Sequence, residues 1–326
     1  MQHLVIIDGH HLMYRAYWAI PRTMKTSKGE QVNAVFGVAS MLLQILRTEQ
    51  PDAFLFCFDA GDETFRHQED AEYKAGRSKT PDDFYVQIPR IHELIAHFGL
   101  PSVEGNNYEA DDFACTYAKL AAESGARVTL VSGDRDLFQL PTDLIRVAVP
   151  HKGYQMPEYF TPDHVYAKFG VTPLQIPSYK GLVGDSSDNL PGVTGIGPKA
   201  ATALIQQYGS ITEIYNHLAD IKPAWRAKLE AGREQAFFCE RMAQLTCDIP
   251  DTLPLNDLII SPFHHTEILK FFSELEFHLL SKRLTAFLAS PAGERYSFDK
   301  IFSDPAVSED LPSSPKDDEV TQLSLL

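Results

Sequence analysis

The sequence lacks long hydrophobic runs, has little cysteine and carries no excess of positive charge. No apolar run in its 326 residues approaches the roughly 20 residues that span a bilayer, and the N-terminal Leu-Val-Ile-Ile segment is too short for a signal-peptide core. The few cysteines form no Cys-x-x-Cys pair, which argues against a cysteine zinc site. We therefore expect a soluble cytoplasmic protein whose cysteines are all reduced, namely Cys57, Cys115, Cys239 and Cys247.

The formal net charge of −15 argues at first against a nucleic-acid partner. The distribution of this charge weakens the objection. Nine acids are concentrated in five short motifs of the first 190 residues, and six more accompany the single Lys316 within residues 303–326. The remainder of the chain is nearly neutral, so local basic patches can still bind phosphates.

The motifs LVIIDGH, FLFCFDAG, YEADD, SGDRD and GDSSDN are the most informative feature of the chain. Three of them follow apolar runs, at 4–7, 53–58 and 127–131, that are typical of buried parallel strands. Ligands bind beyond the carboxyl ends of such strands, so Asp8, Asp59 and Asp134 are predicted to share one edge of a sheet. Taken singly, each acid could instead be a surface residue or a helix cap, as at Asp111 and Asp134.

Clustered carboxylates repel one another unless a cation lies between them, and hard divalent ions such as Mg²⁺ or Mn²⁺ prefer oxygen ligands. Nine carboxylates suit two ions, the arrangement that catalyses in-line displacement at phosphorus. Because hard ions favour oxygen, we expect His10 and His11 not to be ligands. The predicted metal-binding residues are Asp8, Asp59, Glu109, Asp111, Asp112, Asp134, Asp136, Asp185 and Asp188.

Spacing adds an expectation about how some of these acids are arranged. Glu109 and Asp112 are three residues apart, as are Asp185 and Asp188, so a helix would place each pair on one face. An extended turn would point the side chains of Asp134 and Asp136 to the same side.

The order of predicted elements indicates an α/β fold, with a mostly parallel twisted sheet flanked by helices over residues 1–160. Strands are expected at 4–7, 53–58, 102–104, 127–131 and 144–149, and helices at 32–49, 84–98 and 110–124. Residues 161–290 are predicted to form a helical module. Residues 296–326 are rich in Ser, Pro and Asp and are predicted to be a disordered acidic tail.

A polar insertion at 61–82 carries charges of both signs, including Arg66, Lys74, Arg77 and Lys79. One interpretation is a solvated face. The other is a clamp for a single strand, in which Arg66 contacts DNA and Lys74 and Arg77 face the scissile phosphate.

The segment GVTGIGPKAA, residues 192–201, is typical of a helix–hairpin–helix turn. Its glycines let backbone N–H groups approach a phosphate, and a helix N-terminus favours the anion. Gly195, Gly197 and Lys199 are therefore candidate DNA-binding residues, although the segment could be an ordinary helix connection. We expect the aromatic residues Tyr14, Tyr17 and Trp18 to be core or pocket wall rather than base-stacking groups.

Together, the segments VIIDGHHLMYRAYWA, FCFDAGDETFRHQEDAEYKAGR, YEADDFACTYA, VSGDRDLFQL and YKGLVGDSSDNLPGVTGIGPKAA resemble the 5′–3′ exonuclease domains of bacterial DNA polymerases I, within the flap endonuclease family. The resemblance covers about residues 3–285. It implies a PIN-like nuclease domain with a helical arch at 61–82, a helix–three-turn–helix at about 182–210, and cleavage of branched DNA with Mg²⁺ or Mn²⁺. It places all nine carboxylates at metal positions, Lys74 and Arg77 in the arch, and Arg15 near the site.

The resemblance also implies that backbone oxygens of the helix–three-turn–helix can hold K⁺, here around Leu182, Val183, Pro191, Val193 and Ile196. No polymerase sequence follows, so we expect either a stand-alone nuclease or one cut from a longer protein. The terminal QLSLL resembles the peptide by which replication proteins bind the bacterial sliding clamp, with Gln322, Leu323, Leu325 and Leu326 as its contacts.

The sequence thus predicts a monomeric 5′ nuclease that acts on 5′ flaps and RNA primers in Okazaki fragment processing and DNA repair. Two alternatives stay open. One is a PIN-type ribonuclease, which the duplex-reading turn argues against. The other is a non-catalytic flap-binding factor that recruits partners, which the full set of acids argues against.

Overall fold

One six-stranded sheet organises the protein, whose computed structural model describes residues 1–70, 72–75 and 80–297. Its strand order is β3-β2-β1-β4-β5-β6, and every neighbouring pair is parallel except β5 with β6. This confirms the predicted α/β class. The strands are β1 (His3–Asp8), β2 (Ala53–Thr64), β3 (Ser102–Asn107), β4 (Arg127–Val131), β5 (Ile145–Val149) and β6 (Glu158–Phe160).

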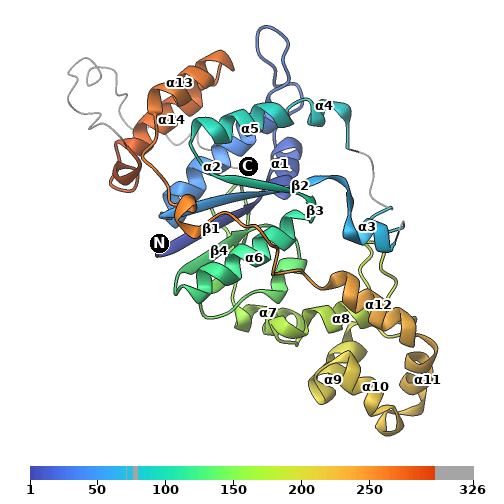
Figure 1. The fold of residues 1–326 in the computed structure, drawn as a ribbon. Coiled ribbons are helices and arrows are strands. Elements are labelled where there is room, and N and C mark those ends of the chain that lie inside the picture. Colours follow the sequence, from blue (N-terminus) through green and yellow to red (C-terminus); the bar gives the residue numbers. More distant parts are fainter. Residues whose placement is uncertain (71, 76–79, 298–326) are drawn as a thin grey trace.

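The two faces of the sheet pack against different helices, because side chains alternate along each strand. In β1, Val5 and Ile7 pack in the core under α1 (Gly9–Ala19), α2 (Asn33–Glu49) and α5 (Ile88–His97). Leu4 and Ile6 belong to the opposite core, beneath α6 (Ala110–Glu123). Figure 1 shows these helices on the two sides of the strands. Strand β2 continues to Thr64, beyond the expected end at residue 58, so Asp59 lies within this strand and not after it.

The expected strands all form, and β4 has the predicted bounds. Two differences have local causes. The helix expected at 84–98 is divided into α4 (Asp82–Tyr85) and α5, which restarts at Ile88 with a proline in its first turn and with the buried Gln87 side chain bonded to the start of α2. Strand β6 is three residues long, too short to produce a recognisable alternation.

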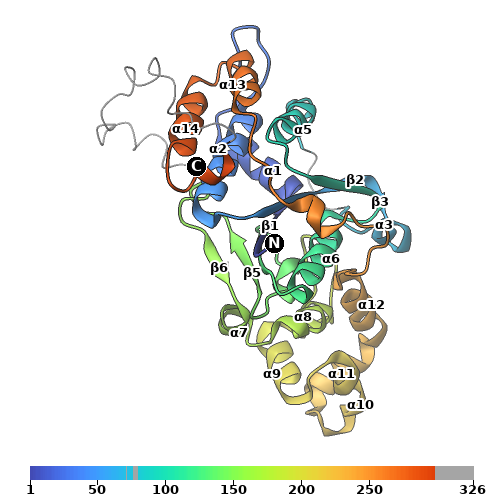
Figure 2. The ribbon, with the colours of Figure 1, turned by 60° about the vertical axis from the view of Figure 1, so that its left-hand side comes forward.

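The chain after residue 161 is helical in the described residues, as predicted, but it does not form one module. The helices α7 to α12 lie below the α6 side of the sheet (Figures 1 and 2). Helices α13 (His265–Glu274) and α14 (His278–Leu288) instead pack into the core on the α2 side.

No described helix is long and apolar enough to cross a membrane. The remaining helices are α3 (Phe65–Glu69), α7 (Pro162–Phe169), α8 (Ile176–Val183), α9 (Pro198–Tyr208), α10 (Ile211–Asn216), α11 (Pro223–Ala231) and α12 (Arg233–Ala243), with short 3₁₀ turns η1 (Asp136–Gln139), η2 (Pro173–Gln175), η3 (Leu218–Asp220), η4 (Leu255–Leu258) and η5 (Glu294–Tyr296).

The prediction that all four cysteines are reduced is wrong for one pair. Cys115, in α6, forms a disulfide with Cys247, which lies 132 residues later in the segment after α12. Cys57 and Cys239 are free and buried, as expected. A pairing of this kind depends on how the chain folds back on itself, and nothing in the local spacing of the cysteines reports it.

Candidate metal centre

The carboxyl ends of β1 and β4 meet at Asp8, as predicted. Asp8 is the N-cap of α1: its Oδ1 accepts a hydrogen bond from the His11 backbone N–H at 3.0 Å. Its Oδ2 accepts one from Ser132 Oγ at 2.7 Å, and the same Ser132 Oγ accepts one from the Asp134 N–H at 2.9 Å. This hydroxyl therefore ties together the two strand ends that present Asp8 and Asp134.

Asp111 lies at the centre of the first group of acids. It sits in the first turn of α6, whose Ala110 N–H donates to Asp59 Oδ1 at 2.7 Å. The Oδ1 atom of Asp111 is buried and has no hydrogen-bond partner in the described chain. Burial, followed by the charges of Asp134, Asp8 and Asp59, raises the pKa of Asp111 well above its usual range. An unpartnered carboxylate oxygen surrounded by three other acids is suited to a cation.

A second group of acids adjoins the first through Asp134. Burial raises the pKa of Asp188, the charges of Asp134 and Asp185 act in the same direction, and Lys74 and Lys180 oppose them. Asp134 thus acts electrostatically on both groups. In the described part of the chain no three acidic, histidine or cysteine side chains already surround a single point as ligands. A hard ion here would retain water ligands, as Mg²⁺ commonly does.

The motif GDSSDN differs from the expected geometry. Asp185 and Asp188 do not share a helical face, because residues 186–189 form a turn after α8. The Asp185 Oδ1 atom accepts the Ser187 N–H at 2.9 Å, an Asx-type turn that competes with helix formation. Asp134 closes a similar turn by accepting the Asp136 N–H at 2.9 Å, so the extended arrangement predicted for that pair is also wrong.

Lys180 is a site residue that the sequence analysis missed. It lies in α8, is 7% exposed, and its Nζ contacts Asp136 Oδ1 and, at 2.7 Å, Asp185 Oδ2. Burial alone would raise the pKa of Asp185, but the Lys180 charge and hydrogen bonds from Lys180 and Ser187 lower it. The sequence signal for Lys180 as a site residue was its position one helical turn before the GDSSDN motif.

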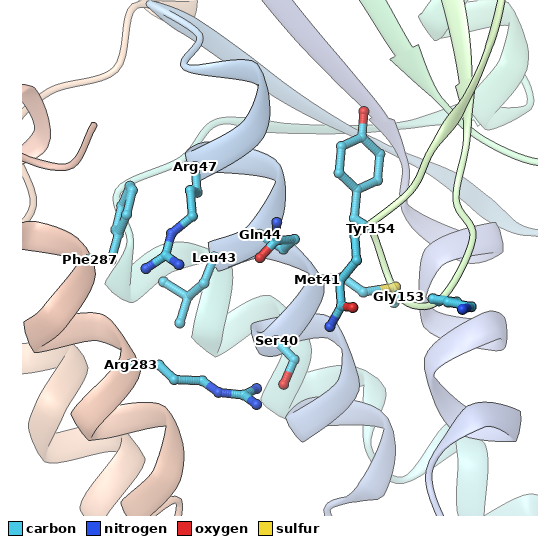
Figure 3. A pocket seen from close by; sticks show the side chains of 11 residues that line it. Ser40, Met41, Leu43, Gln44, Arg47, Gly153, Tyr154, Arg283 and Phe287 are labelled. Carbon is cyan, nitrogen blue, oxygen red and sulfur yellow. The ribbon is translucent and has the colours of Figure 1, made fainter. Parts of the chain in front are cut away.

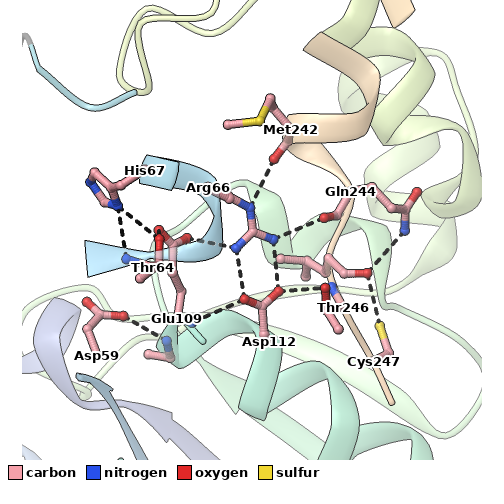
Figure 4. A network of polar contacts seen from close by, with 12 residues as sticks. Asp59, Thr64, Arg66, His67, Glu109, Asp112, Met242, Gln244, Thr246 and Cys247 are labelled. Atoms are coloured by element: carbon pink, nitrogen blue, oxygen red, sulfur yellow. Dashed lines mark hydrogen bonds and ion pairs between the residues drawn. The ribbon is translucent and has the colours of Figure 1, made fainter. Parts of the chain in front are cut away.

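Arg66, predicted to contact DNA, is only 1% exposed. Its side chain instead binds the buried carboxylates of Asp112 and Glu109 in the protein interior (Figure 4). Its Nη1 and Nη2 donate to Asp112 Oδ2 and Oδ1, each at 2.8 Å, and Nη1 lies 3.2 Å from Glu109 Oε2. It also donates to the backbone oxygens of Met242 and Gln244. Arg66 therefore joins the insertion, α6 and the segment after α12, and it is not on a DNA-binding surface.

Asp112 is correspondingly unlike the other predicted ligands. Besides Arg66, its two oxygens accept the backbone N–H groups of Glu109 at 3.1 Å and Thr246 at 2.9 Å, and the residue is fully buried. As expected from their spacing, Glu109 and Asp112 do meet, through a reciprocal capping box at the start of α6. Asp112 is thus held by Arg66 and backbone N–H groups, and it orients the N-terminus of α6.

The insertion brings Lys74 to the acidic edge. Lys74 Nζ lies 2.9 Å from Glu109 Oε1, and its backbone N–H donates to the Asp188 carbonyl at 3.2 Å. Its charge acts on Asp111 and Asp188. Arg77 lies outside the described residues. Arg15, in α1, is half-buried and makes no ion pair or hydrogen bond with any described residue, and burial lowers its pKa.

The Gly-rich turn joins α8 to α9, as predicted. Gly195 has φ +81° and is exposed, Gly197 and Lys199 are also exposed, and α9 begins at Pro198. Lys228, a basic residue not predicted, donates to the Gly195 carbonyl at 2.9 Å.

The residues proposed around K⁺ lie in the same turn region. Leu182 and Val193 are linked by a backbone hydrogen bond of 2.9 Å, and their neighbours there are Val183, Pro191 and Ile196. Potassium binding there stays a prediction.

The histidines and aromatics after Asp8 are divided between structural roles and the surface. His10 Nδ1 accepts the Asp59 N–H at 3.1 Å, and His11 Nδ1 accepts the Gly133 N–H at 3.2 Å, so both rings bond to backbone. Of the three aromatics, Tyr17 is buried, whereas Tyr14 and Trp18 are 44% and 53% exposed on α1.

Comparisons with known proteins agree with this fold. The model of the 5′-3′ exonuclease N-terminal resolvase-like domain matches residues 3–170, and that of the 5′-3′ exonuclease C-terminal SAM fold matches residues 171–266. DNA polymerase I of Bacillus subtilis is 40% identical over 282 residues, which is 86% of this chain and 32% of that protein. Thermostable DNA polymerase I of Thermus thermophilus is 42% identical over 247 residues, 76% of this chain and 29% of that one. The chain thus spans about a third of the length of these relatives.

Solved structures show the same fold. The flap endonuclease of bacteriophage T5, in a complex with DNA and metal ions, has a TM-score of 0.64 at 21% identity, covering 90% of this chain and 100% of that one. Flap endonuclease-1 from Methanococcus jannaschii has a TM-score of 0.55 at 18% identity, covering 86% and 90%. With both family models matched in order along the sequence, this chain belongs to the 5′–3′ exonuclease family.

Proposed function

We propose that this chain is a structure-specific 5′ nuclease that hydrolyses DNA phosphodiesters with two divalent cations, Mg²⁺ or Mn²⁺. The observation that carries the proposal is the buried, unpartnered Asp111 oxygen among Asp8, Asp59 and Asp134, beside a second acid group formed with Asp185 and Asp188. Such ions, when bound, generate a hydroxide nucleophile and stabilise the leaving oxygen.

The protein's own residues position these groups. Ser132 fixes the strand ends that carry Asp8 and Asp134, and the Arg66–Asp112 pair fixes the start of α6. Lys180 lies against Asp136 and Asp185 and limits their mutual repulsion. In the proposed complex, Lys74 leaves Glu109 and neutralises charge that develops on the scissile phosphate, together with Arg77 and Arg15.

The proposed substrate is branched DNA with a 5′ flap or 5′ end, including RNA-primer junctions, in Okazaki fragment processing and repair. In this proposal the exposed turn with Gly195, Gly197 and Lys199 holds the duplex backbone, and K⁺ is a structural ion of that turn. Binding of the sliding clamp through residues 322–326 is a separate proposal, based on sequence alone. We place the protein at the nucleoid, where these substrates occur, and expect it to act as a monomer.

The decisive experiment is single-turnover cleavage of an end-labelled 5′-flap duplex in Mg²⁺, with binding measured in Ca²⁺. Cutting at the flap junction in Mg²⁺, with binding but no cutting in Ca²⁺, is expected. Binding without cutting in either Mg²⁺ or Mn²⁺ would support a non-catalytic flap-binding factor. Faster cutting of structured RNA than of the DNA flap would support a ribonuclease.

Two variants sharpen this test. Lys74→Ala should slow the chemical step more than it weakens flap binding, while Lys119→Ala, an exposed lysine of α6, should change neither. The reverse pattern for Lys74 would contradict a role at the scissile phosphate. Deleting residues 322–326 should leave basal cleavage intact and remove any stimulation by the clamp; unchanged clamp affinity would rule out that peptide.

A further inference from the structure

A basic pocket of about 220 Å³ lies away from the metal centre, between α2, the loop from β5 to β6, and α14. Of the residues predicted for catalysis or DNA binding, none that the structure describes lines it. Figure 3 shows the side chains of Arg47 and Arg283 approaching it from α2 and α14. Lys152, in the loop, adds a third cation, and the described lining residues include no acid.

Arg283 is the central group because nothing in the described chain neutralises it. It is half-buried, and its side chain makes no ion pair or hydrogen bond with any described residue. Burial, followed by the charge of Arg47, lowers its pKa. Arg47 is held in place over the Phe287 ring, with its guanidinium carbon 6.0 Å from the ring centroid. Two guanidinium groups that line one pocket repel each other unless an anion compensates their charge.

A second observation also points to a missing ligand. The hydroxyl oxygen of Ser40, on the α2 wall of the pocket, is buried and has no hydrogen-bond partner in the described residues. Buried polar groups are nearly always hydrogen-bonded, so an unpaired hydroxyl beside unpaired cations requires an explanation. An oxyanion would accept hydrogen bonds from the hydroxyl and the guanidinium groups together.

We propose that this pocket binds a phosphate group, held by Arg283, Arg47 and Lys152 with a hydrogen bond from Ser40. Arginine presents planar pairs of N–H donors that match phosphate oxygens, and three cations suit a multiply charged oxyanion. The phosphate can come from free phosphate or from a nucleic-acid backbone that crosses α2 and α14. This site is independent of the metal centre and of the proposed nuclease activity.

The test is calorimetric titration of the full chain with inorganic phosphate, in EDTA so that metal-bound phosphate does not contribute. Wild-type protein should bind phosphate, and Arg283→Gln should weaken binding at least 10-fold. Lys282→Gln, an exposed neighbour on α14 that does not line the pocket, should change affinity less than 2-fold. Removing one of two repelling cations should not lower the unfolding temperature of Arg283→Gln, so a loss of binding will not reflect misfolding.

Flap-DNA binding in Ca²⁺ then distinguishes the two sources. Weaker DNA binding by Arg283→Gln than by Lys282→Gln, with a salt dependence reduced by about one counterion, would identify a backbone phosphate. Loss of phosphate binding with unchanged DNA affinity would identify free phosphate. Absence of phosphate binding to the wild type, or equal affinities in Arg283→Gln and Lys282→Gln, would overturn the proposal.

Discussion

Arg66 and Asp112 form a bidentate ion pair, with both N···O distances at 2.8 Å, in which the Arg66 side chain is 2% exposed and the Asp112 side chain is 0% exposed. The pair joins the base of the charged insertion to the helix that presents Asp111. It thus couples the position of Lys74, eight residues further along the insertion, to the acids at the carboxyl edge of the sheet. The geometry of the site therefore depends on how the base of this insertion packs against α6.

Replacing Arg66 with methionine should destabilise the protein by about 3–5 kcal/mol, because Asp112 would remain buried without its counter-ion. Denaturant unfolding followed by circular dichroism measures this loss. The control is Arg22→Met, which breaks a bidentate pair with Asp83 on the surface, where the Arg22 side chain is 48% exposed. A loss in Arg66→Met no larger than that of the control would show that the buried pair does not support the fold.

Replacing Asp111 with asparagine should remove stabilisation by metal while leaving the metal-free protein at least as stable, since one repelling charge disappears. Cleavage should fall by more than the roughly 10–100-fold typical of residues that only support ligands. Thermal unfolding with and without Mn²⁺ provides the readout, and Asp143→Asn, at an exposed acid, is the matched control. An undiminished Mn²⁺ shift in Asp111→Asn would remove this residue from the site.

The pH dependence of stability should depend on Glu49, a buried acid far from the metal centre. Burial alone would raise its pKa, but hydrogen bonds from Tyr159 and Tyr154 and the charge of Arg146 lower it. A lowered pKa in the folded state gives stability that is present above the unfolded value of 4.5 and is lost as pH falls through the folded pKa.

Glu49→Gln should therefore cost roughly 3 kcal/mol at neutral pH, and the difference from wild type should shrink below pH 4.5. Urea unfolding at a series of pH values measures it, with Glu123→Gln at an exposed position as the control. A difference that does not change with pH would mean that Glu49 contributes by packing and not by its charge.

The disulfide between Cys115 and Cys247 predicts two free thiols in the denatured, unreduced protein and four after reduction. Because it closes a loop of 132 residues, its reduction should lower stability by about 4–5 kcal/mol in the chain-entropy model. Thiol titration with paired thermal unfolding tests both points, and the Cys115→Ser variant should be insensitive to reductant. Four reactive thiols before reduction would show that the pair is not bonded.

Much of the site could be predicted because its acids follow strand-like runs. Asp8, Asp59 and Asp134 were placed at one sheet edge from local pattern, and the edge does bring their motifs together. The roles of Arg66 and Lys180 could not be read in the same way. Each was one charged residue among many in its segment, and only its burial against Asp112, or against Asp136 and Asp185, gives it a role.

By itself, the sequence determined the α/β class, the order of most strands and helices along the chain, and which acids gather at the carboxyl edge of the sheet, because alternation, apolar runs and short motifs act over a few residues. Only the tertiary structure decided the Cys115–Cys247 bond, the return of α13 and α14 to the sheet, and the packing of Arg47 and Arg283 around one pocket. These features join residues from about 130 to more than 230 positions apart in the sequence. Their contacts depend on which surfaces the folded layers bring together, and that information is absent from any local segment.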